Sequence, residues 1–232
     1  RQGVVPLNPI QRSTPPRPTE PEAVYYTPAR LARLLQAVDG TSLEVPVRLA
    51  CFLGLRRGEL LGLRWRDVDL QSGQLSVRWV RTAAGARVVE KPPKTAGSCR
   101  TLSIAALGEL LELLRALRTQ RRQEGLPCSP DDFLLLGMDG RPIRPSALSS
   151  SLAAFVWEHR LPPITFHGLR HTFASMANSA RVPMYQISRA MGHASPGITQ
   201  RIYTHLFDQT HGEVLAAVAN VVKADSTSLT SA

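Results

Sequence analysis

The chain has 232 residues, a length that suits one domain with a sizeable hydrophobic core, with or without tails. Hydrophobic residues make up 43% of it and charged residues 20%, which excludes global disorder and is ordinary for a soluble globular protein. No apolar run approaches the roughly 18 residues that span a membrane, and the opening RQGVVPLNPI has no apolar signal core, so we expect neither a membrane protein nor a secreted one.

The chain is strongly basic, since 28 Lys and Arg residues oppose 18 Asp and Glu residues for a formal net charge of +10. Only three of the basic residues are Lys, and the Arg guanidinium is the better bidentate ligand for phosphate. This balance favours a polyanion such as nucleic acid, although a GC-rich genome that encodes Arg in place of Lys would give the same composition. The cysteines (Cys51, Cys99 and Cys128) are odd in number and lack C-x-x-C spacing, which predicts reduced thiols in a cytoplasmic protein.

Residues 1–22 are rich in proline and lack apolar periodicity, which predicts an extended linker. The chain also begins without Met, so we expect a fragment or processed form whose linker follows an upstream domain. We assign residues 23–223 to one domain and residues 224–232 to a flexible tail.

The first helix is expected to begin at Thr27-Pro28, an N-cap followed by proline at the first helical position, and to end at Asp39-Gly40. Two more helices are expected at 43–53 and 57–63. Alternating patterns predict antiparallel strands at 74–80, 86–90 and 100–104. Residues 91–99 are expected to form a loop, because Pro92-Pro93 cannot lie inside a paired strand.

The strongest helical pattern covers residues 105–122, where one face carries leucines that we expect in the core: Leu107, Leu110, Leu111, Leu114 and Leu117. Shorter helices are expected at 145–158, 168–179, 183–191, 196–205 and 212–223. The sequence therefore predicts a mainly α fold with a small three-stranded antiparallel sheet, which places it in the α+β class.

Polar groups that packing alone explains poorly occur at five places, namely Arg56, Lys94, the pair His167 and Arg170, His193, and Tyr203. One helical turn would bring His167 and Arg170 to the same face. Each residue taken singly has an ordinary explanation: a solvated cation, a structural His, or a half-buried Tyr with its hydroxyl in water. Only their order along the chain points to shared chemistry.

That order resembles the tyrosine recombinases, in particular the phage-type integrases. The matching stretches are GLRRGELLGLRW (54–65), PPKTAGSCRTL (92–102), FHGLRHTFAS (166–175) and MGHASPGITQRIYTH (191–205). The resemblance covers about residues 24–210 and implies the catalytic-domain fold of that family. It also implies DNA cleavage and rejoining through a 3′-phosphotyrosyl intermediate, with integration or excision of a mobile element as the expected biological role.

The resemblance implies six catalytic residues, which are Arg56, Lys94, His167, Arg170, His193 and Tyr203. Arg56 and Arg170 would clamp the scissile phosphate, and Tyr203 would be the nucleophile. Lys94 would protonate the leaving 5′-oxygen, and His167 is the natural acceptor for the tyrosine proton.

His193 and two residues outside the six have supporting parts in this interpretation. His193, the second histidine of the family signature, would add a hydrogen bond to the phosphate. Glu59 matches the acidic residue that follows the first arginine and would support it. His171 also occurs at this place in many integrases, and we expect it to be structural.

The implied partner is double-stranded DNA, with no membrane and no cofactor or metal. The family pattern implies four protomers on two DNA sites, with strands exchanged in pairs through a Holliday junction, and a monomer or weak oligomer without DNA. The apolar helix expected at 212–223 is compatible with packing in cis or on a neighbouring protomer.

Other functions were weighed against this interpretation. Zinc catalysis is disfavoured, because Gly168 stands where the metalloprotease motif needs Glu beside the first His. A type IB topoisomerase would use nearly the same groups to relax DNA without a specific site. A DNA-binding module without catalysis would explain the charge but would make Tyr203 and the two signature histidines coincidental.

Overall fold

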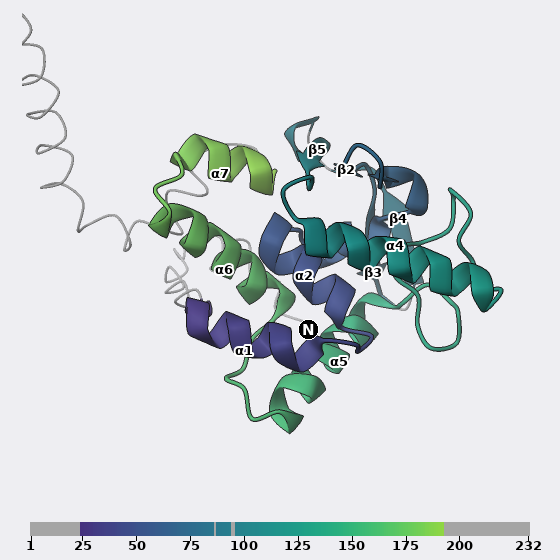
Figure 1. Ribbon diagram of the computed structural model, residues 1–232, viewed down its shortest axis with the longest axis horizontal. Helices are drawn as coiled ribbons and strands as arrows, with labels where there is room; N and C mark the ends of the chain where they lie inside the picture. Colours follow the sequence, from purple (N-terminus) through teal and green to yellow (C-terminus); the bar gives the residue numbers. More distant parts are fainter. Residues whose placement is uncertain (1–23, 86, 94–95, 193–232) are drawn as a thin grey trace, which may run out of the picture.

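A computed structural model describes residues 24–85, 87–93 and 96–192 (Figure 1). Its helices are α1 (Pro28–Val38), α2 (Glu44–Leu53), α3 (Arg57–Gly62), α4 (Gly108–Gln123), α5 (Pro145–Glu158), α6 (Phe166–Ser179) and α7 (Met184–Met191), with short 3-10 helices η2 (Trp65–Asp67) and η3 (Ala96–Ser98). Its strands are β1 (Val68–Asp69), β2 (Gln74–Val77), β3 (Val80–Ala84), β4 (Arg87–Lys91) and β5 (Arg100–Ser103).

Helix α2 is the centre of the fold and contacts α1, α3, α4 and α6 (Figure 1). Its sequence EVPVRLACFL is apolar on most sides, as expected for a helix that is covered by several neighbours. Helix α1 begins as its sequence predicts, because the Thr27 hydroxyl accepts a hydrogen bond from the Arg30 N–H and proline follows at the first position. The described core is one large cluster that joins these helices to the inner faces of α4 and α5.

The leucine stripe of α4 is confirmed as core. Leu110, Leu111 and Leu114 are buried, and Leu107 and Leu117 pack against the same cluster while partly exposed. Most charged residues of α4 are exposed, so this helix lies with one side on the core and one in solvent, but Arg121 is buried and donates to the carbonyls of Phe133 and Leu134.

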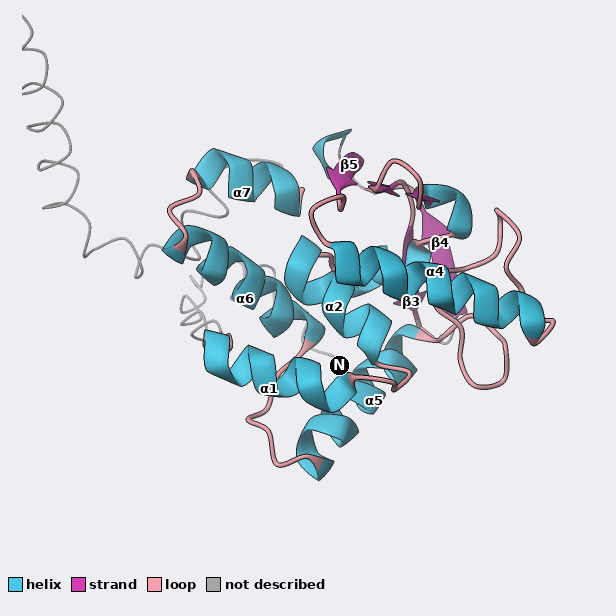
Figure 2. Cartoon of the chain, viewed as in Figure 1, coloured by secondary structure: helices cyan, strands magenta, loops and turns pink. Residues whose placement is uncertain are grey.

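The antiparallel strands lie beside the helices in two small sheets (Figure 2). The first contains three strands in the order β1-β2-β5, with Val77 opposite Arg100, and the second pairs β3 with β4. The expected mainly α class with a small three-stranded antiparallel sheet is confirmed. Two details are wrong: the strand expected at 74–80 is split into β2 and β3, and the strand expected at 86–90 pairs with β3 in the second sheet, while β1 completes the first.

The split has a steric cause in the packing of α3. A Cβ atom at Gly62 would lie 2.4 Å from the carbonyl oxygen of Trp79, so the chain passes directly over this glycine. Residues 78–79 therefore leave the plane of the first sheet, and β3 runs along α3 before it pairs with β4. Alternation within 74–80 cannot reveal this bend, because it depends on a helix that is close only in the fold.

The remaining expectations differ from the structure mainly at element ends. The helix expected at 168–179 begins earlier, at Phe166, because the Thr165 hydroxyl caps it by accepting a hydrogen bond from the Gly168 N–H. The helices expected at 196–205 and 212–223 lie outside the described residues. Within the described part of the chain, no helix is both long and apolar enough to cross a membrane.

Candidate active site

Arg56 stands at the N-cap of α3, where its backbone is extended and the helix begins at the next residue. Glu59, three residues on, accepts hydrogen bonds from the Arg56 N–H at 2.9 Å and from the Arg56 Nη1 atom at 2.8 Å. A Glu at this position satisfies an otherwise free N–H at the start of the helix. The same carboxylate thus fixes both the backbone and the guanidinium of Arg56, whose side chain remains 40% exposed.

Glu59 is itself buried, with a side chain that is 1% exposed. Its second partner is Arg100 on β5, whose Nη1 and Nη2 atoms lie 3.2 and 3.0 Å from the two carboxylate oxygens. Burial alone would raise the pKa of Glu59, but the hydrogen bonds and charges of Arg100 and Arg56 outweigh it and hold the pKa below its ordinary value. Glu59 is therefore an ionised acceptor between two guanidinium groups.

Arg170 reaches the same place from α6 and is almost completely buried. Its Nη1 atom donates to the carbonyl of Gly54, which ends α2, and its Nη2 atom donates to the carbonyl of Met191 at 2.7 Å. The Nη1 atom also lies 4.0 Å from a Glu59 oxygen. Arg170 thereby ties α6 to the ends of α2 and α7.

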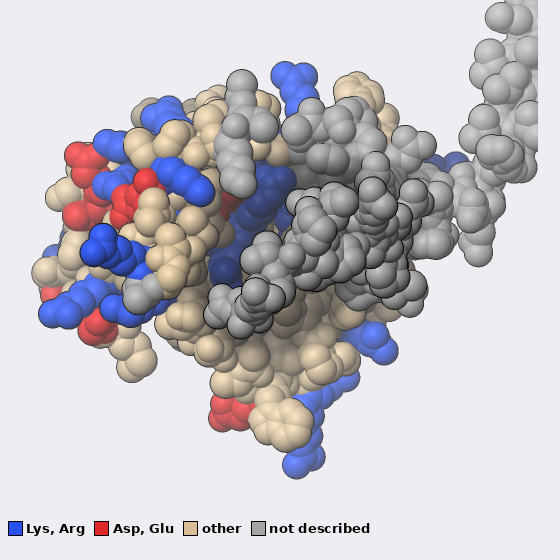
Figure 3. Space-filling model, turned by 180° about the vertical axis from the view of Figure 1, so that it is seen from behind, with Lys and Arg blue, Asp and Glu red and all other residues tan. Residues whose placement is uncertain are grey.

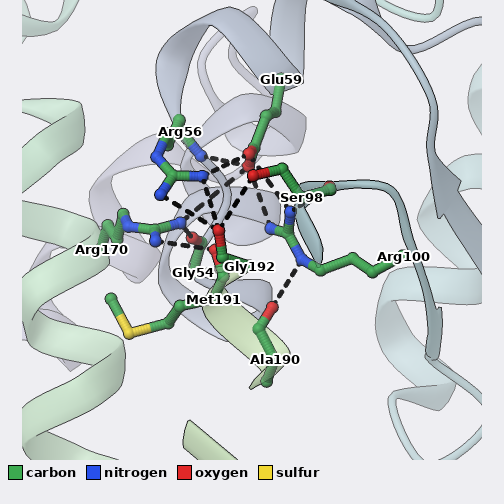
Figure 4. Close-up of polar contacts among 9 residues, drawn as sticks. All are labelled: Gly54, Arg56, Glu59, Ser98, Arg100, Arg170, Ala190, Met191 and Gly192. Carbon is green, nitrogen blue, oxygen red and sulfur yellow. Dashed lines mark hydrogen bonds and ion pairs between the residues drawn. The ribbon is translucent and has the colours of Figure 1, made fainter. Parts of the chain in front are cut away.

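The C-terminal end of α7 is held by three arginines from three other elements (Figure 4). Three successive carbonyls accept from them, Ala190 from Arg100, Met191 from Arg170 and Gly192 from Arg56. The C-terminus of a helix carries free carbonyls and a partial negative charge, so it is a natural neighbour for cations. The bonds from Arg56 are the longest, at 3.3 and 3.4 Å, which leaves this guanidinium the least constrained.

Gly192 allows this arrangement through its backbone. Its φ of +66° is left-handed, the usual way for a helix to end, and its carbonyl also accepts from the Ser98 hydroxyl at 3.2 Å. A Cβ atom here would lie 2.6 Å from the Nη1 atom of Arg100. The left-handed conformation favours glycine, and any larger residue here would displace the Arg100 guanidinium.

Two histidines on α6 lie beside this cluster. The rings of His167 and His171 meet edge to face with their centroids 4.4 Å apart. Partial burial of the ring lowers the pKa of His167 below its ordinary 6.5, and the positive charges of Arg170 and Arg56 lower it further. Burial, His167 and Arg170 lower the pKa of His171 to about 4. Both rings are therefore neutral at pH 7, and the more exposed His167 is able to accept a proton.

Three of the six expected site residues lie in the described part of the chain, and the fold brings them together: Arg56, His167 and Arg170. Lys94, His193 and Tyr203 lie outside the described residues. In sequence, His193 directly follows Gly192, the residue whose carbonyl the Arg56 guanidinium contacts. On the face turned away from the viewer of Figure 1, Lys and Arg side chains gather at the floor of a hollow (Figure 3).

Arg100 is a member of the cluster that residue patterns did not single out. It lies within the quoted stretch PPKTAGSCRTL, on a strand whose expected place was correct. Nothing in that stretch distinguishes a buried arginine from a solvated one, so its partners emerge only in the fold.

Comparison with known proteins decides the family. The model of the phage integrase family matches residues 25–210, most of the chain. The chain belongs to the phage integrase family. The resemblance found in the motifs is confirmed, and the matched range nearly coincides with the 24–210 expected from them.

Curated relatives of this integrase-family chain include two from bacteria. The "Tyrosine recombinase XerC-like" protein of Caldanaerobacter subterraneus subsp. tengcongensis is 30% identical over 209 residues, which cover 83% of this chain and 53% of the relative. The "ICEBs1 integrase" of Bacillus subtilis is 29% identical over 200 residues, covering 84% of this chain and 54% of the relative. The chain thus spans about half the length of these relatives.

Solved structures share the fold. The Tn1549 transposon integrase in complex with circular intermediate DNA superposes with a TM-score of 0.74 at 22% identity, over 88% of this chain and 68% of that one. XerA recombinase superposes with a TM-score of 0.63 at 26% identity, over 88% of this chain and 66% of that one. The expected tyrosine recombinase catalytic-domain fold is confirmed.

Proposed function

We propose that this chain is the catalytic domain of a site-specific DNA recombinase that cleaves and rejoins strands through Tyr203. The observation that carries the proposal is the position of Arg56, whose guanidinium is held by Glu59 and contacts the Gly192 carbonyl while its side chain remains 40% exposed. It lies in one cluster with Arg170 and beside a neutral His167. Family membership supplies the reaction class, and this cluster supplies groups suited to a phosphodiester.

A phosphodiester resists attack because its negative charge repels nucleophiles and grows on the non-bridging oxygens in the transition state. Arginine keeps its charge at every physiological pH and presents a planar fork of donors that matches those oxygens. Donors that are fixed before the reaction stabilise this charge without reorganising, and loss of one such donor costs about 10²–10³ in rate in other enzymes. In the proposal, Arg56 and Arg170 stabilise this charge, and the cleavage step requires no metal.

The covalent step exchanges one phosphodiester for another. The Tyr203 oxygen attacks phosphorus, the bond from phosphorus to the 5′-oxygen breaks, and a 3′-phosphotyrosyl link and a free 5′-hydroxyl result. His167 accepts the tyrosine proton, which its lowered pKa permits because the ring is neutral at pH 7. Lys94 supplies the proton to the leaving oxygen, and His193 adds a hydrogen bond to the phosphate. Attack by another 5′-hydroxyl reverses the step and needs no ATP.

The partners in this proposal are double-stranded DNA and further copies of the protein. The net charge of +10 favours DNA, and the integrase relative of Bacillus subtilis and the solved transposon integrase complex act as precedents for integration or excision of a mobile element. We further propose that residues 1–22 connect this domain, at 23–223, to an upstream core-binding domain that closes a clamp on DNA, and that four protomers assemble on two sites.

Covalent trapping on a nicked suicide substrate tests the proposal. The DNA comes from the ends of the element that encodes the protein. The nick makes the fragment that carries the new 5′-hydroxyl short enough to diffuse away after cleavage, so that the adduct cannot reseal. The chain should give an adduct that resists denaturation, and Tyr203→Phe should give none while it binds DNA with nearly unchanged affinity. The chain joined to its upstream domain is run beside it, because loss of half the clamp removes phosphate contacts and weakens binding.

Three outcomes would contradict the proposal in different ways. An adduct that survives in Tyr203→Phe would remove Tyr203 as the nucleophile. Tight DNA binding without any adduct, also with the upstream domain present, would indicate a DNA-binding module. Relaxation of supercoiled DNA that lacks any specific site would indicate a topoisomerase.

A further inference from the structure

We infer that Arg100 is a positioning residue for strand cleavage, which holds Arg56, through Glu59, in register with the end of α7. This inference rests on the proposed function, because the register matters only if Arg56 binds the scissile phosphate. It adds a residue that has no part in the chemistry described above and that lies on a different element, strand β5.

The donors of Arg100 are directed into the protein. An arginine side chain has five N–H donors, and the Arg100 side chain directs four hydrogen bonds inward, two to Glu59, one to the Ala190 carbonyl at 2.6 Å and one to the Ser98 carbonyl at 3.2 Å. Its side chain is only 7% exposed, against 40% for Arg56. Arg100 is therefore poorly placed to bind a DNA phosphate itself, and its effect must pass through its partners.

These partners belong to two different elements, α3 and α7. In α3, Glu59 accepts from Arg100 and Arg56 with the same carboxylate, so a shift of Arg100 changes the anchor of Arg56. In α7, Ala190 belongs to the last turn, two residues before Gly192 and three before His193. Arg100 thus links the residue that orients Arg56 to the last turn of α7.

The linkage leaves little freedom for movement. A methyl group added as a side chain at Gly192 would overlap the Arg100 guanidinium, because the two residues lie so close together. Two parallel hydrogen bonds to Glu59 also fix the plane of the guanidinium, which a single ammonium could not do. A lysine in this place would retain the charge but lose the fork, and with it the fixed distance between Glu59 and Ala190.

The test compares Arg100→Lys with a matched control, Arg115→Lys. Arg115 lies on α4, is 45% exposed and pairs with Glu112 outside the site. Adduct formation on the nicked substrate is measured at saturating DNA and, separately, the affinity for the same DNA. We expect Arg100→Lys to keep its DNA affinity within about threefold and to form adduct at least about tenfold more slowly, since small misplacements of reacting groups cost rate more than binding. The control should match wild type in both measurements.

A double-variant cycle separates positioning from general loss of structure. If Arg100 acts through Arg56, then Arg100→Lys should slow an Arg56→Lys protein far less than it slows wild type, because the group it positions is already impaired. An equal slowing in both backgrounds would overturn the inference, and so would a wild-type rate for Arg100→Lys at saturating DNA.

Two further controls distinguish the expected loss of rate from unfolding of the variant and from failure of the proposed function. If thermal melting shows that Arg100→Lys is unfolded at the assay temperature, the Glu59→Gln/Arg100→Gln protein replaces it, since that pair buries no charge. A wild-type rate in this folded double variant would also overturn the inference, and a loss of rate with unchanged DNA affinity would support it. Absence of adduct in the wild-type protein, in contrast, would contradict the proposed function and not the part of Arg100.

Discussion

Replacement of Glu59 by Ala is the most informative test of the arginine cluster. In the folded chain this carboxylate is 1% exposed and accepts four hydrogen bonds, two from Arg56 and two from Arg100, at 2.8–3.2 Å. Glu59→Ala removes all four and leaves the Arg100 guanidinium, 7% exposed, without its carboxylate. The dominant cost is the buried positive charge of Arg100, to which that of Arg170, 1% exposed and 4.0 Å from Glu59, adds, because the Arg56 guanidinium can turn to water.

The magnitude follows from the burial of the pair. Removing one partner of a buried ion pair costs about 3–5 kcal/mol, whereas an exposed pair contributes about 0–1 kcal/mol. At about 2–4 °C per kcal/mol for a domain of this size, Glu59→Ala should lower the melting temperature by about 10 °C. Glu112→Ala is the control, because Glu112 pairs with Arg115 at the surface of α4 and is 73% exposed. It should lower the melting temperature by no more than about 2 °C.

Urea unfolding followed by circular dichroism measures these free energies. The Glu59→Ala/Arg100→Met double variant is measured beside them, since it removes the stranded charge and should recover part of the lost stability. A cost below about 1 kcal/mol for Glu59→Ala would refute the reasoning. Equal stabilities of the single and double variants would show that the buried charge of Arg100 is not the cause.

Three further predictions follow from the same geometry. Gly192→Ala should abolish or strongly slow adduct formation while DNA binding persists, because the new Cβ overlaps Arg100 and the backbone is left-handed; a wild-type rate would contradict this. The pKa of His171 is about 4 in the folded chain against an ordinary 6.5, so the unfolded chain binds the proton more tightly. The contribution of His171 to the free energy of unfolding should therefore be fully present above about pH 6.5 and should fall by up to about 3 kcal/mol as the pH drops to about 4. His171→Gln should remove this loss in urea titrations. The loss would be absent if the ring were protonated in the folded chain. Arg170→Lys should lower the melting temperature by several degrees and Arg56→Lys by little, because only Arg170 is buried with two carbonyl partners; equal shifts would contradict this.

The sequence by itself determined the features that depend on neighbours along the chain. The start of α1 at Thr27-Pro28, the leucine face of α4 and the place of Arg56 at the entrance to α3 all follow from local rules of capping and periodicity. The motifs also determined the family, because the order of its signature residues needs no knowledge of distances. The six site residues inferred from that order stay a prediction until they are tested by substitution.

Only the tertiary structure decided what each arginine does. Arg56, Arg100 and Arg170 are the same residue type and carry no local mark of burial, yet one is exposed and the other two are buried against helix ends. The break between β2 and β3 is of the same kind, since it arises where Trp79 crosses Gly62. Burial and close approach are set by segments far apart in sequence, and a pattern of neighbouring residues holds no information about that distance.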